Sequence, residues 1–333
     1  MLAGFLLNRI EQQAKPAVGF NPKQCLRSRL NTNACEKCLN VCRSGAISLN
    51  GRNIVFSEDR CRGCMACVSE CPNDAFDCGF NFSELLQALQ YKGSSDPVVM
   101  SCDATHLPEN LISIPCIGVL SGPVLAALHC AAKEEFYLDV RRCVDCSKGH
   151  VLDLLHDRIQ GIISRRGTTS DLKIRYKTEE NYQHFSFRQK RRGFLRMSLK
   201  SMKRLGKEAS LTLVQGENRD TDRNGEGKEP PAINRLLQQA LDVMPENAVQ
   251  DKELLLSYHY RVTADENCDL CPLCTGMCPT GALKRGTAGN RKKLVFTSAG
   301  CSGCGLCVNF CRKKALTLHP GIQTAPHDPL TIV

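Results

Sequence analysis

The chain has 333 residues, of which 22 are cysteine, 5% are aromatic and none is tryptophan, and its formal net charge is +10. It contains no run of the roughly 18 apolar residues that a membrane-spanning helix needs, which excludes a helical membrane protein. The apolar N-terminal segment is too short for a secretory signal, so we expect free thiolates and not the disulfides of an extracellular domain. We therefore expect a cytoplasmic protein made of small modules that metal helps to hold together.

Residues 1–22 begin with an apolar segment. Leu2, Phe5, Leu6 and Ile10 recur at helical spacing, which predicts an amphipathic helix. We expect this helix to pack on the protein itself, with docking to a partner as the alternative.

Residues 23–80 contain the first candidate metal region. Cys61 to Pro72 reads C-R-G-C-M-A-C-V-S-E-C-P, in which three cysteines are two residues apart and the fourth follows after three. Three thiolates at this spacing surround one [4Fe–4S] cluster, and the fourth serves a second cluster. The upstream partner, C-E-K-C-L-N-V-C from Cys35, lacks its first cysteine, because Thr32 stands there.

The simplest repair is a loop insertion that makes Cys25 the displaced first ligand, since a longer loop adds little closure entropy. The alternative leaves Cys25 idle and gives the first site three cysteines and a [3Fe–4S] cluster. With crossed ligation, the first ligand set is Cys25, Cys35, Cys38 and Cys71. The second ligand set is Cys42, Cys61, Cys64 and Cys67.

Residues 256–320 repeat the pattern without irregularity, as C-D-L-C-P-L-C-T-G-M-C-P and C-S-G-C-G-L-C-V-N-F-C. Zinc sites pair two Cys-x2-Cys knuckles and leave no third spaced cysteine, so the pattern favours iron–sulfur clusters. Both regions resemble bacterial two-cluster ferredoxins. The crossed scheme gives one set of Cys268, Cys271, Cys274 and Cys311. It gives another set of Cys278, Cys301, Cys304 and Cys307.

Each region also carries a predicted hairpin between its two cysteine motifs. In the first, Asn50–Gly51 separates two alternating apolar runs, which is typical of a tight β-turn. In the second, the turn is longer and rich in glycine and lysine. We therefore expect a duplicated module at the two ends of the chain.

Residues 81–180 have a different pattern. Predicted strands run from Asp96 to Cys102, Leu111 to Cys116, Glu135 to Cys143 and over 172–177. Helices are predicted over 122–133 and 151–165. Strands that alternate with helices indicate a mainly parallel sheet, whose strands end at one edge. The expected fold class is α+β multidomain, with two ferredoxin-like 2[4Fe–4S] modules flanking this small α/β domain.

The central cysteines stand at the predicted strand ends, so we expect them to converge there as Cys102, Cys116, Cys143 and Cys146. Four thiolates suit a [2Fe–2S] cluster or zinc, and buried structural cysteines are the alternative to both. The motifs V-M-S-C, I-P-C-I-G and C-V-D-C-S-K-G-H resemble the delta subunit of methyl-viologen-reducing hydrogenases. That resemblance implies a [2Fe–2S] module through which electrons enter, beside a flavin or hydrogenase partner.

Residues 181–255 contain a strongly basic segment at 188–207 and a flexible linker at 215–231, followed by a helix predicted over 232–243. A basic amphipathic helix could lie on an acidic partner or on anionic lipid at the inner membrane face; a solvated linker helix is the alternative. Residues 321–333 form a tail. The candidate docking residues are Arg188, Lys190, Arg191, Arg192, Arg196, Lys200, Lys203 and Arg204.

The net charge does not require nucleic acid as a partner. An oxidised [4Fe–4S] cluster with four thiolates carries about −2, so four clusters bring the loaded protein to roughly +2. The basic composition therefore largely offsets the clusters, and aromatic groups for base stacking are sparse.

The leading hypothesis is an electron-transfer subunit of an anaerobic redox complex, because the sequence has no Rossmann glycine fingerprint and no P-loop. Its partner would be a flavin-, molybdenum/tungsten- or nickel-dependent oxidoreductase, or a heterodisulfide-reductase-like assembly. One alternative is a reductase acting on a thiol, a disulfide or a flavin at the central cysteines. Another is an iron–sulfur sensor or nucleic-acid binder.

Overall fold

The computed structural model describes residues 18–92, 97–102, 111–167, 171–178, 228–288, 291–322 and 326–332. The helix expected near the N-terminus and the basic segment from Arg188 lie outside these ranges. The chain divides into two compact units, one of Lys177–Lys228 and one of all other residues. The following description concerns the second, larger unit. No helix among the described residues is long and apolar enough to cross a membrane.

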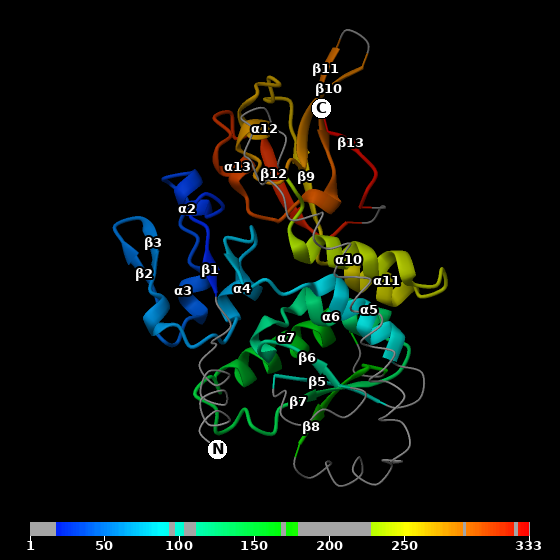
Figure 1. The fold of residues 1–333 in the computed structure, drawn as a ribbon. Helices are drawn as coiled ribbons and strands as arrows, with labels where there is room; N and C mark the ends of the chain where they lie inside the picture. Colours follow the sequence, from blue (N-terminus) through cyan, green and yellow to red (C-terminus); the bar gives the residue numbers. More distant parts are fainter. Residues whose placement is uncertain are drawn as a thin grey trace, which may run out of the picture. The chain divides into compact units, whose positions relative to one another are not determined.

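The N-terminal module has short elements around a hairpin (Figure 1). The turn predicted at Asn50–Gly51 is confirmed, since β2 and β3 pair in antiparallel fashion and Gly51 has a φ of +59°. The first and last strands, β1 and β4, also pair in antiparallel fashion, and Phe20 stacks on Phe76. The elements are β1 (Gly19–Phe20), α2 (Leu26–Arg29), α3 (Lys37–Val41), β2 (Ile47–Asn50), β3 (Asn53–Phe56), η1 (Glu58–Arg60), α4 (Ala66–Glu70) and β4 (Phe76–Asp77).

The described part of the C-terminal module has the same order of elements, except that it has no counterpart of α2 and adds the strand β13. Its outer strands β9 and β12 pair in antiparallel fashion around the hairpin of β10 and β11, and β13 adds to β11. The strands of this hairpin are longer than those of the first, but the expected longer turn is wrong, because β10 and β11 pair as far as Ala288 and Arg291. The elements are β9 (Tyr260–Ala264), α12 (Leu273–Met277), β10 (Leu283–Ala288), β11 (Arg291–Phe296), η4 (Ser298–Gly300), α13 (Leu306–Asn309), β12 (Leu316–Pro320) and β13 (Leu330–Thr331).

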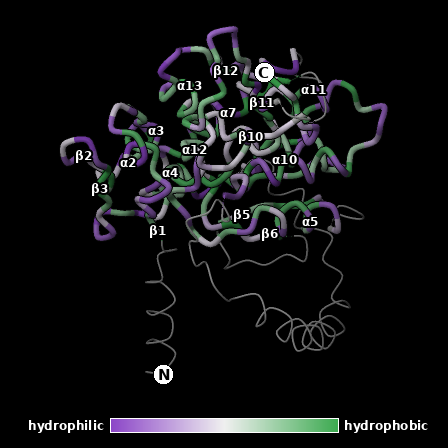
Figure 2. The backbone as a smooth tube through the Cα atoms, turned by 90° about the horizontal axis from the view of Figure 1, so that it is seen from above, coloured by the Kyte–Doolittle hydropathy of each residue, from purple (hydrophilic) through white to green (hydrophobic). Residues whose placement is uncertain are grey.

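The central domain contains a four-stranded sheet in the order β6-β5-β7-β8. Strand β5 pairs in parallel with both β6 and β7, which confirms the predicted parallel sheet. All four residues of β5 are buried, and Figure 2 shows this strand in green. The elements are α5 (Phe82–Lys92), β5 (Val98–Ser101), β6 (Leu111–Ser113), η2 (Ile117–Val119), α6 (Gly122–Ala131), β7 (Phe136–Asp139), α7 (Val151–Arg166) and β8 (Ile174–Lys177).

The predicted strand from Glu135 to Cys143 is shorter in the structure, because β7 ends at Asp139. The Asp139 carboxylate accepts hydrogen bonds from the backbone and side chain of Arg141, which turns the chain away from the sheet. Cys143 and Cys146 consequently lie in the turn that follows β7.

Two helices follow the linker, α10 (Ala232–Val243) and α11 (Val249–Leu256). The helix predicted over 232–243 is confirmed. Sequence patterns group both helices with the linker segment 181–255, whereas in the structure they lie against α6 (Figure 1). Leu236, Leu237 and Ala240 of α10 are buried in one core that extends from the N-terminal module through the central domain, and the C-terminal module has its own core.

Candidate metal centres

The structure brings the first set of cysteines together despite its irregular spacing. Cys25 precedes α2, Cys38 lies in α3, and Cys71 follows α4. Burial, then the charges of Cys71, Cys35 and Cys25, raises the pKa of the Cys38 thiol to about 12. Cys25 therefore lies beside the other three, where a fourth ligand of this site is needed.

A buried arginine closes the loop between Cys25 and Cys35. The Arg27 side chain, 8% exposed, donates from Nε to the Cys35 carbonyl over 2.6 Å and from a terminal nitrogen to Glu36 Oε1 over 2.9 Å. It also donates to the carbonyl of Arg52 in the hairpin. These bonds hold the ten-residue detour in the shape that places Cys25.

The second set, Cys42, Cys61, Cys64 and Cys67, is grouped in the same way. Burial raises the pKa of Cys67, and the charges of Cys64, Cys61 and Cys42 raise it further. The two sets share their helices. Helix α3 carries a ligand of one set and ends at a ligand of the other, as does α4. The crossing is seen in the electrostatic contacts, because the Cys38 thiol lies near Cys71 and the Cys67 thiol lies near Cys42.

Several ligand loops adopt the same backbone conformation. Gly63 and Met65 in the first module have φ values of +65° and +61°, and Gly303 and Gly305 at the matching positions of the second have +66° and +71°. This conformation favours glycine, so Met65 is held there by its surroundings, where it is fully buried. A left-handed residue also stands three positions after each last cysteine, at Gly45, Asp74, Gly281 and Lys314.

These loops aim backbone N–H groups at sulfur. Gly63 donates to Cys61 Sγ over 3.4 Å, and Ala75 donates to Cys71 Sγ over 3.2 Å. Hydrogen bonds to thiolates stabilise their charge, and around a cluster they tune its reduction potential. The donor set therefore fits an iron–sulfur cluster.

In the C-terminal module, electrostatic contacts connect all four cysteines of one set and three of the four cysteines of the other. Burial, then Cys301, Cys304 and Cys278, raises the pKa of the Cys307 thiol to about 12. Burial, then Cys271 and Cys268, raises that of Cys274 to about 11. Cys311, the expected fourth member of the latter set, is half-buried against the same core.

The four central cysteines also converge. Burial, followed by the charges of Cys102, Cys116 and Cys146, raises the pKa of the Cys143 thiol to about 12. Cys116 and Cys143 are buried, whereas Cys102 and Cys146 are exposed. The backbone N–H of Lys148 donates to Cys146 Sγ over 3.5 Å. This site therefore reaches the protein surface.

The central site lies directly against the second cysteine set. The Cys64 charge reaches Cys116, and a Cβ built on Gly118 would lie only 2.1 Å from the Cys64 carbonyl oxygen. Only a residue without a side chain permits this approach of the two backbones. Glycine at this position thus brings the central domain into contact with a ligand loop.

Arg158 on α7 holds the same junction. Its guanidinium donates to the carbonyls of Gly118 and Leu120 over 3.1 Å each, and to Ser69 Oγ and Glu70 Oε1 over 2.7 and 2.8 Å. The side chain is 8% exposed. One arginine therefore connects α7, η2 and α4.

The spacing of the thiols can be compared with the spacing of the ligands of a single zinc ion. Four ligands about 2.3 Å from one zinc ion stand about 3.8 Å apart. In the described residues, only His129, Cys130 and Asp251 bring three potential ligand atoms within 4.8 Å of one another. No three cysteine sulfurs of the described residues lie that close together, and thiolates around an iron–sulfur cluster are spaced more widely because the irons lie between them.

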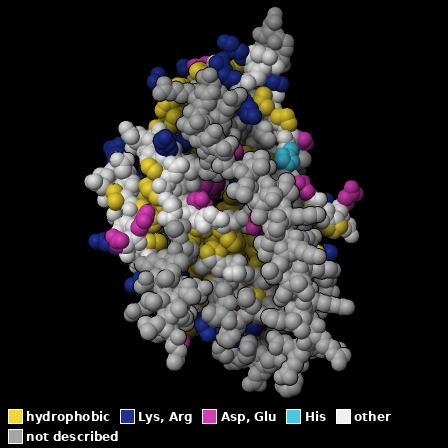
Figure 3. Space-filling model, in the orientation of Figure 1, with side chains coloured by type: hydrophobic (Ala, Val, Ile, Leu, Met, Phe, Trp, Pro, Cys, Tyr) yellow, Lys and Arg dark blue, Asp and Glu magenta, His cyan; other side chains and the backbone are white. Residues whose placement is uncertain are grey.

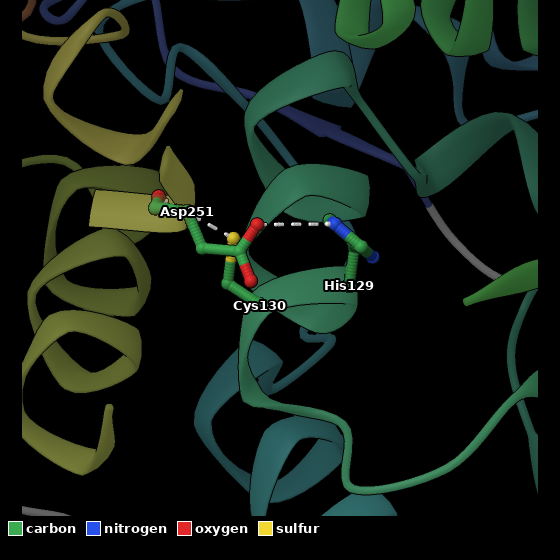
Figure 4. A group of neighbouring side chains, drawn as sticks. All are labelled: His129, Cys130 and Asp251. Carbon is green, nitrogen blue, oxygen red and sulfur yellow. Dashed lines mark hydrogen bonds and ion pairs between the residues drawn. The ribbon is translucent and has the colours of Figure 1, made fainter. Parts of the chain in front are cut away.

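The group of His129, Cys130 and Asp251 is a buried polar network (Figure 4). The backbone N–H of Lys173 donates to His129 Nδ1, so the ring proton is on Nε2, which faces Asp251 Oδ1 at 3.5 Å. Arg166 also pairs with Asp251 at 3.3 Å. The hydrogen on Nε2 and the positive charge of the neighbouring guanidinium both disfavour a metal ion at this position. We therefore interpret the group as a structural contact that connects α6, α7 and α11.

Other sequence-predicted and unassigned residues lie elsewhere. The eight docking residues from Arg188 to Arg204 fall outside the described part of the chain. Cys78 and Cys130, to which the sequence gives no ligand role, are packed in the first core. Arg27, Gly118 and Arg158 were missed by sequence reasoning, and only Arg27 had a local signal, its place two residues after Cys25.

The comparisons with known proteins concern one segment. The family described as "4Fe-4S dicluster domain" matches residues 32–75. No curated protein and no solved structure matches the chain. The matched segment contains the cysteines from Cys35 to Cys71, so the chain carries a ferredoxin-type domain for [4Fe–4S] clusters, and this supports iron–sulfur electron transfer.

Proposed function

We propose that the chain relays electrons through four [4Fe–4S] clusters and one [2Fe–2S] cluster, as a subunit of an oxidoreductase complex. The observation that carries this proposal is the contact between Gly118 and Cys64, because it joins the central cysteines to a ligand loop of the 4Fe-4S dicluster domain. Five sites in one chain provide a route for electrons over a distance that one cluster does not cover.

The C-terminal module is proposed as a second two-cluster domain. Two features support this proposal beyond the cysteine spacing. The outer strands pair around a hairpin in both modules. The left-handed pair at Gly63 and Met65 recurs at Gly303 and Gly305. A loop that wraps a cluster needs this conformation to aim its N–H groups inward, so its recurrence supports a shared ligand.

A [2Fe–2S] cluster is proposed for the central site in preference to zinc. Each iron of such a cluster takes two thiolates, so the four sulfurs form two pairs. The absence of three closely grouped sulfurs among the described cysteines supports this arrangement over a single zinc ion. The exposure of Cys102, Cys146 and Val144, the last at 76%, supports exchange of electrons with a partner at this site.

When bound, the clusters supply one-electron transfer. The chain holds the thiolates, directs backbone N–H groups at sulfur, and excludes water from buried ligands such as Cys38 and Cys307. Burial and hydrogen bonding at each site adjust the reduction potential. No side chain has to take up or release a proton in this function.

The partner is proposed to be a flavin-, molybdenum/tungsten- or nickel-dependent oxidoreductase of an anaerobic cytoplasm, or a heterodisulfide-reductase-like assembly. Lysine and arginine side chains gather over the C-terminal module in Figure 3. Exposed Arg312, Lys313 and Lys314 follow Cys311 directly, which supports an acidic docking surface on a partner at that end. The basic segment from Arg188 offers a further contact with an acidic protein or with anionic lipid.

A dithiol reductase at Cys143 and Cys146 is the alternative, since the two form a C-x-x-C sequence and Cys146 is exposed. Redox-active pairs have a lowered thiol pKa. Cys143 is buried, so its sulfur is poorly accessible to a substrate disulfide, which favours the electron-relay proposal.

Iron and sulfide analysis tests the proposal. Protein purified without oxygen should contain about 18 iron atoms per chain, or about 16 if the central site holds no iron. Cys143→Ser should lose about two irons and one [2Fe–2S] signal in electron paramagnetic resonance (EPR) while the [4Fe–4S] signals persist. Cys78→Ser, at an unassigned half-buried cysteine, is the control and should keep every iron. Zinc at the central site, or disulfide reduction by the purified chain alone, would overturn the proposal.

A further inference from the structure

The first turn of α10 contacts the ligand loops of both cysteine-rich modules. The backbone N–H of Ala232 donates to Asp74 Oδ2 over 2.9 Å, and Asn234 Nδ2 donates to the carbonyl of Cys301 over 2.9 Å. Asp74 stands three residues after Cys71, and Cys301 is itself a candidate ligand. One helical turn therefore lies between a ligand loop of the N-terminal module and a ligand loop of the C-terminal module.

These contacts form a continuous path of bonds between two sulfur atoms. Cys71 Sγ accepts a hydrogen bond from the backbone N–H of Ala75. The peptide bond joins Ala75 to Asp74. From Asp74 the path continues through the first turn of α10 to the amide of Asn234, and from there to Cys301. Electrons tunnel more readily through covalent and hydrogen bonds than across gaps, so this path favours transfer between the modules.

The amide of Asn234 is well suited to fix the C-terminal end of the path. It is partly buried and donates to two carbonyls of the same loop, those of Ala299 and Cys301. An amide nitrogen has two N–H donors, and both are used here. The position of the Cys301 loop relative to α10 is thus set by one side chain.

The other end of the N-terminal module meets the central site. Gly118 contacts the Cys64 carbonyl, and Arg158 ties α7 to α4 at the same place. Cys71 and Cys64 belong to different ligand sets. The module consequently presents one set toward α10 and the other toward the central cysteines.

We propose that the first turn of α10 is the bridge for electrons between the two modules, so that the five sites form one unbranched series. This inference rests on the proposed function. The order of the sites is Cys268/Cys271/Cys274/Cys311, then Cys278/Cys301/Cys304/Cys307, then Cys25/Cys35/Cys38/Cys71, then Cys42/Cys61/Cys64/Cys67, and finally Cys102/Cys116/Cys143/Cys146. In each step one cluster loses one electron and its neighbour gains it, and no bond or proton is involved.

Magnetic coupling tests the order. Reduced [4Fe–4S] clusters are paramagnetic, so a reduced neighbour broadens the EPR signal of a cluster. In dithionite-reduced protein, Cys304→Ser should remove the broadening of the N-terminal signals that comes from the C-terminal module. Cys271→Ser, which affects the outer site, is the matched variant and should leave that broadening unchanged. Equal effects of the two variants, or none, would overturn the order.

The bridge itself is tested with Asn234→Ala. After partial photoreduction and freeze-quenching, the variant should redistribute electrons between the modules more slowly than the unaltered protein, with the same iron content. Asp242→Ala, at an exposed residue near the other end of α10, should transfer at the unaltered rate. Unchanged transfer in Asn234→Ala would overturn the bridge. Iron too low for four cubanes would instead contradict the proposed function, so the two failures are distinguishable.

Discussion

Arg27 Nε donates to the carbonyl of Cys35 over 2.6 Å, which ties the helix after Cys25 to the segment that carries the next ligand. The same guanidinium reaches Glu36, and its side chain is 8% exposed. The irregular spacing between Cys25 and Cys35 is thereby compensated by one buried side chain. This arrangement supports Cys25 as the fourth ligand of its set in preference to a [3Fe–4S] site.

We therefore predict that Arg27→Ala loosens Cys25 while leaving the other ligands in place. Removing hydrogen bonds that involve a charged group costs about 1.5–3 kcal/mol each. The expected result is conversion of one [4Fe–4S] cluster to [3Fe–4S], seen as a new EPR signal in the oxidised protein and the loss of about one iron.

Arg29→Ala is the control for that variant, because Arg29 lies on the same short helix but is exposed. It should keep the full iron content. An Arg27→Ala protein with unaltered iron and no new signal would show that the detour holds its shape without this arginine.

The second prediction concerns Arg158. Its replacement by alanine leaves Glu70 and two carbonyls at the junction without their donor. Breaking a fully buried ion pair lowers the free energy of unfolding by about 3–5 kcal/mol, and the loss is smaller here because Glu70 is one-third exposed. We expect a lower thermal midpoint and faster hydrogen exchange in α4 and α7. Gln160→Ala, at an exposed position of α7, should have neither effect, and an equal response of both variants would contradict the role of Arg158.

The third prediction concerns Gly118. In Gly118→Ala the added methyl group meets the Cys64 carbonyl at 2.1 Å, so the backbones must move apart. Overpacking of this kind costs about 1–3 kcal/mol, and it should also weaken magnetic coupling between the central site and the second cysteine set. EPR of the reduced protein measures that coupling.

Gly161→Ala is the matched substitution, since its new methyl group would meet only the flexible end of Arg165 at 3.5 Å. Alanine is favoured over glycine within a helix by about 1 kcal/mol, so this variant should be as stable as the unaltered protein or more so. Unchanged coupling in Gly118→Ala would show that the contact does not set the distance between the two sites.

The fourth prediction concerns pH. A hydrogen bond from His129, together with the charges of Arg166 and Lys173, holds the pKa of Asp251 below its usual range. The stabilisation from its charged form is fully present above the unfolded pKa near 4 and is lost as the pH falls through the lower folded value. The stability difference between the unaltered protein and Asp251→Asn should therefore be constant near neutrality and shrink below about pH 4.

Thermal unfolding followed by circular dichroism measures that difference across the pH range. Asp242→Asn removes a carboxylate that is exposed on α10, and it should show no such change with pH. A difference that grows on acidification would contradict the assigned pairing of Asp251.

The parts of the fold that sequence patterns predicted are those that local chemistry determines. Asn50–Gly51 specifies a tight turn, and the leucines of α10 recur at helical spacing. The strands β1 and β9 were missed, because they have two and five residues and depend on pairing with β4 and β12 far along the chain. Sequence patterns similarly group residues 232–255 with the linker segment, because they do not show that these helices contact α6.

The same division applies to the candidate sites. Cysteine spacing predicts which thiols can share a cluster, since it follows from the geometry of a single loop. Gly118, Arg158 and Asn234 act across contacts between segments that are 38 to 89 residues apart, and their own neighbours in sequence carry no sign of it. Contacts of this kind become visible only when the segments are brought together.

The hydrogen bond between Ala232 and Asp74 spans 158 positions of the chain. During synthesis on the ribosome, the N-terminal module emerges long before the helix that covers its Cys71 loop. Until that helix has been made, the loop lacks the contact with Ala232 that the finished chain has. If clusters are inserted during translation, the N-terminal module can therefore receive its clusters before α10 covers this loop.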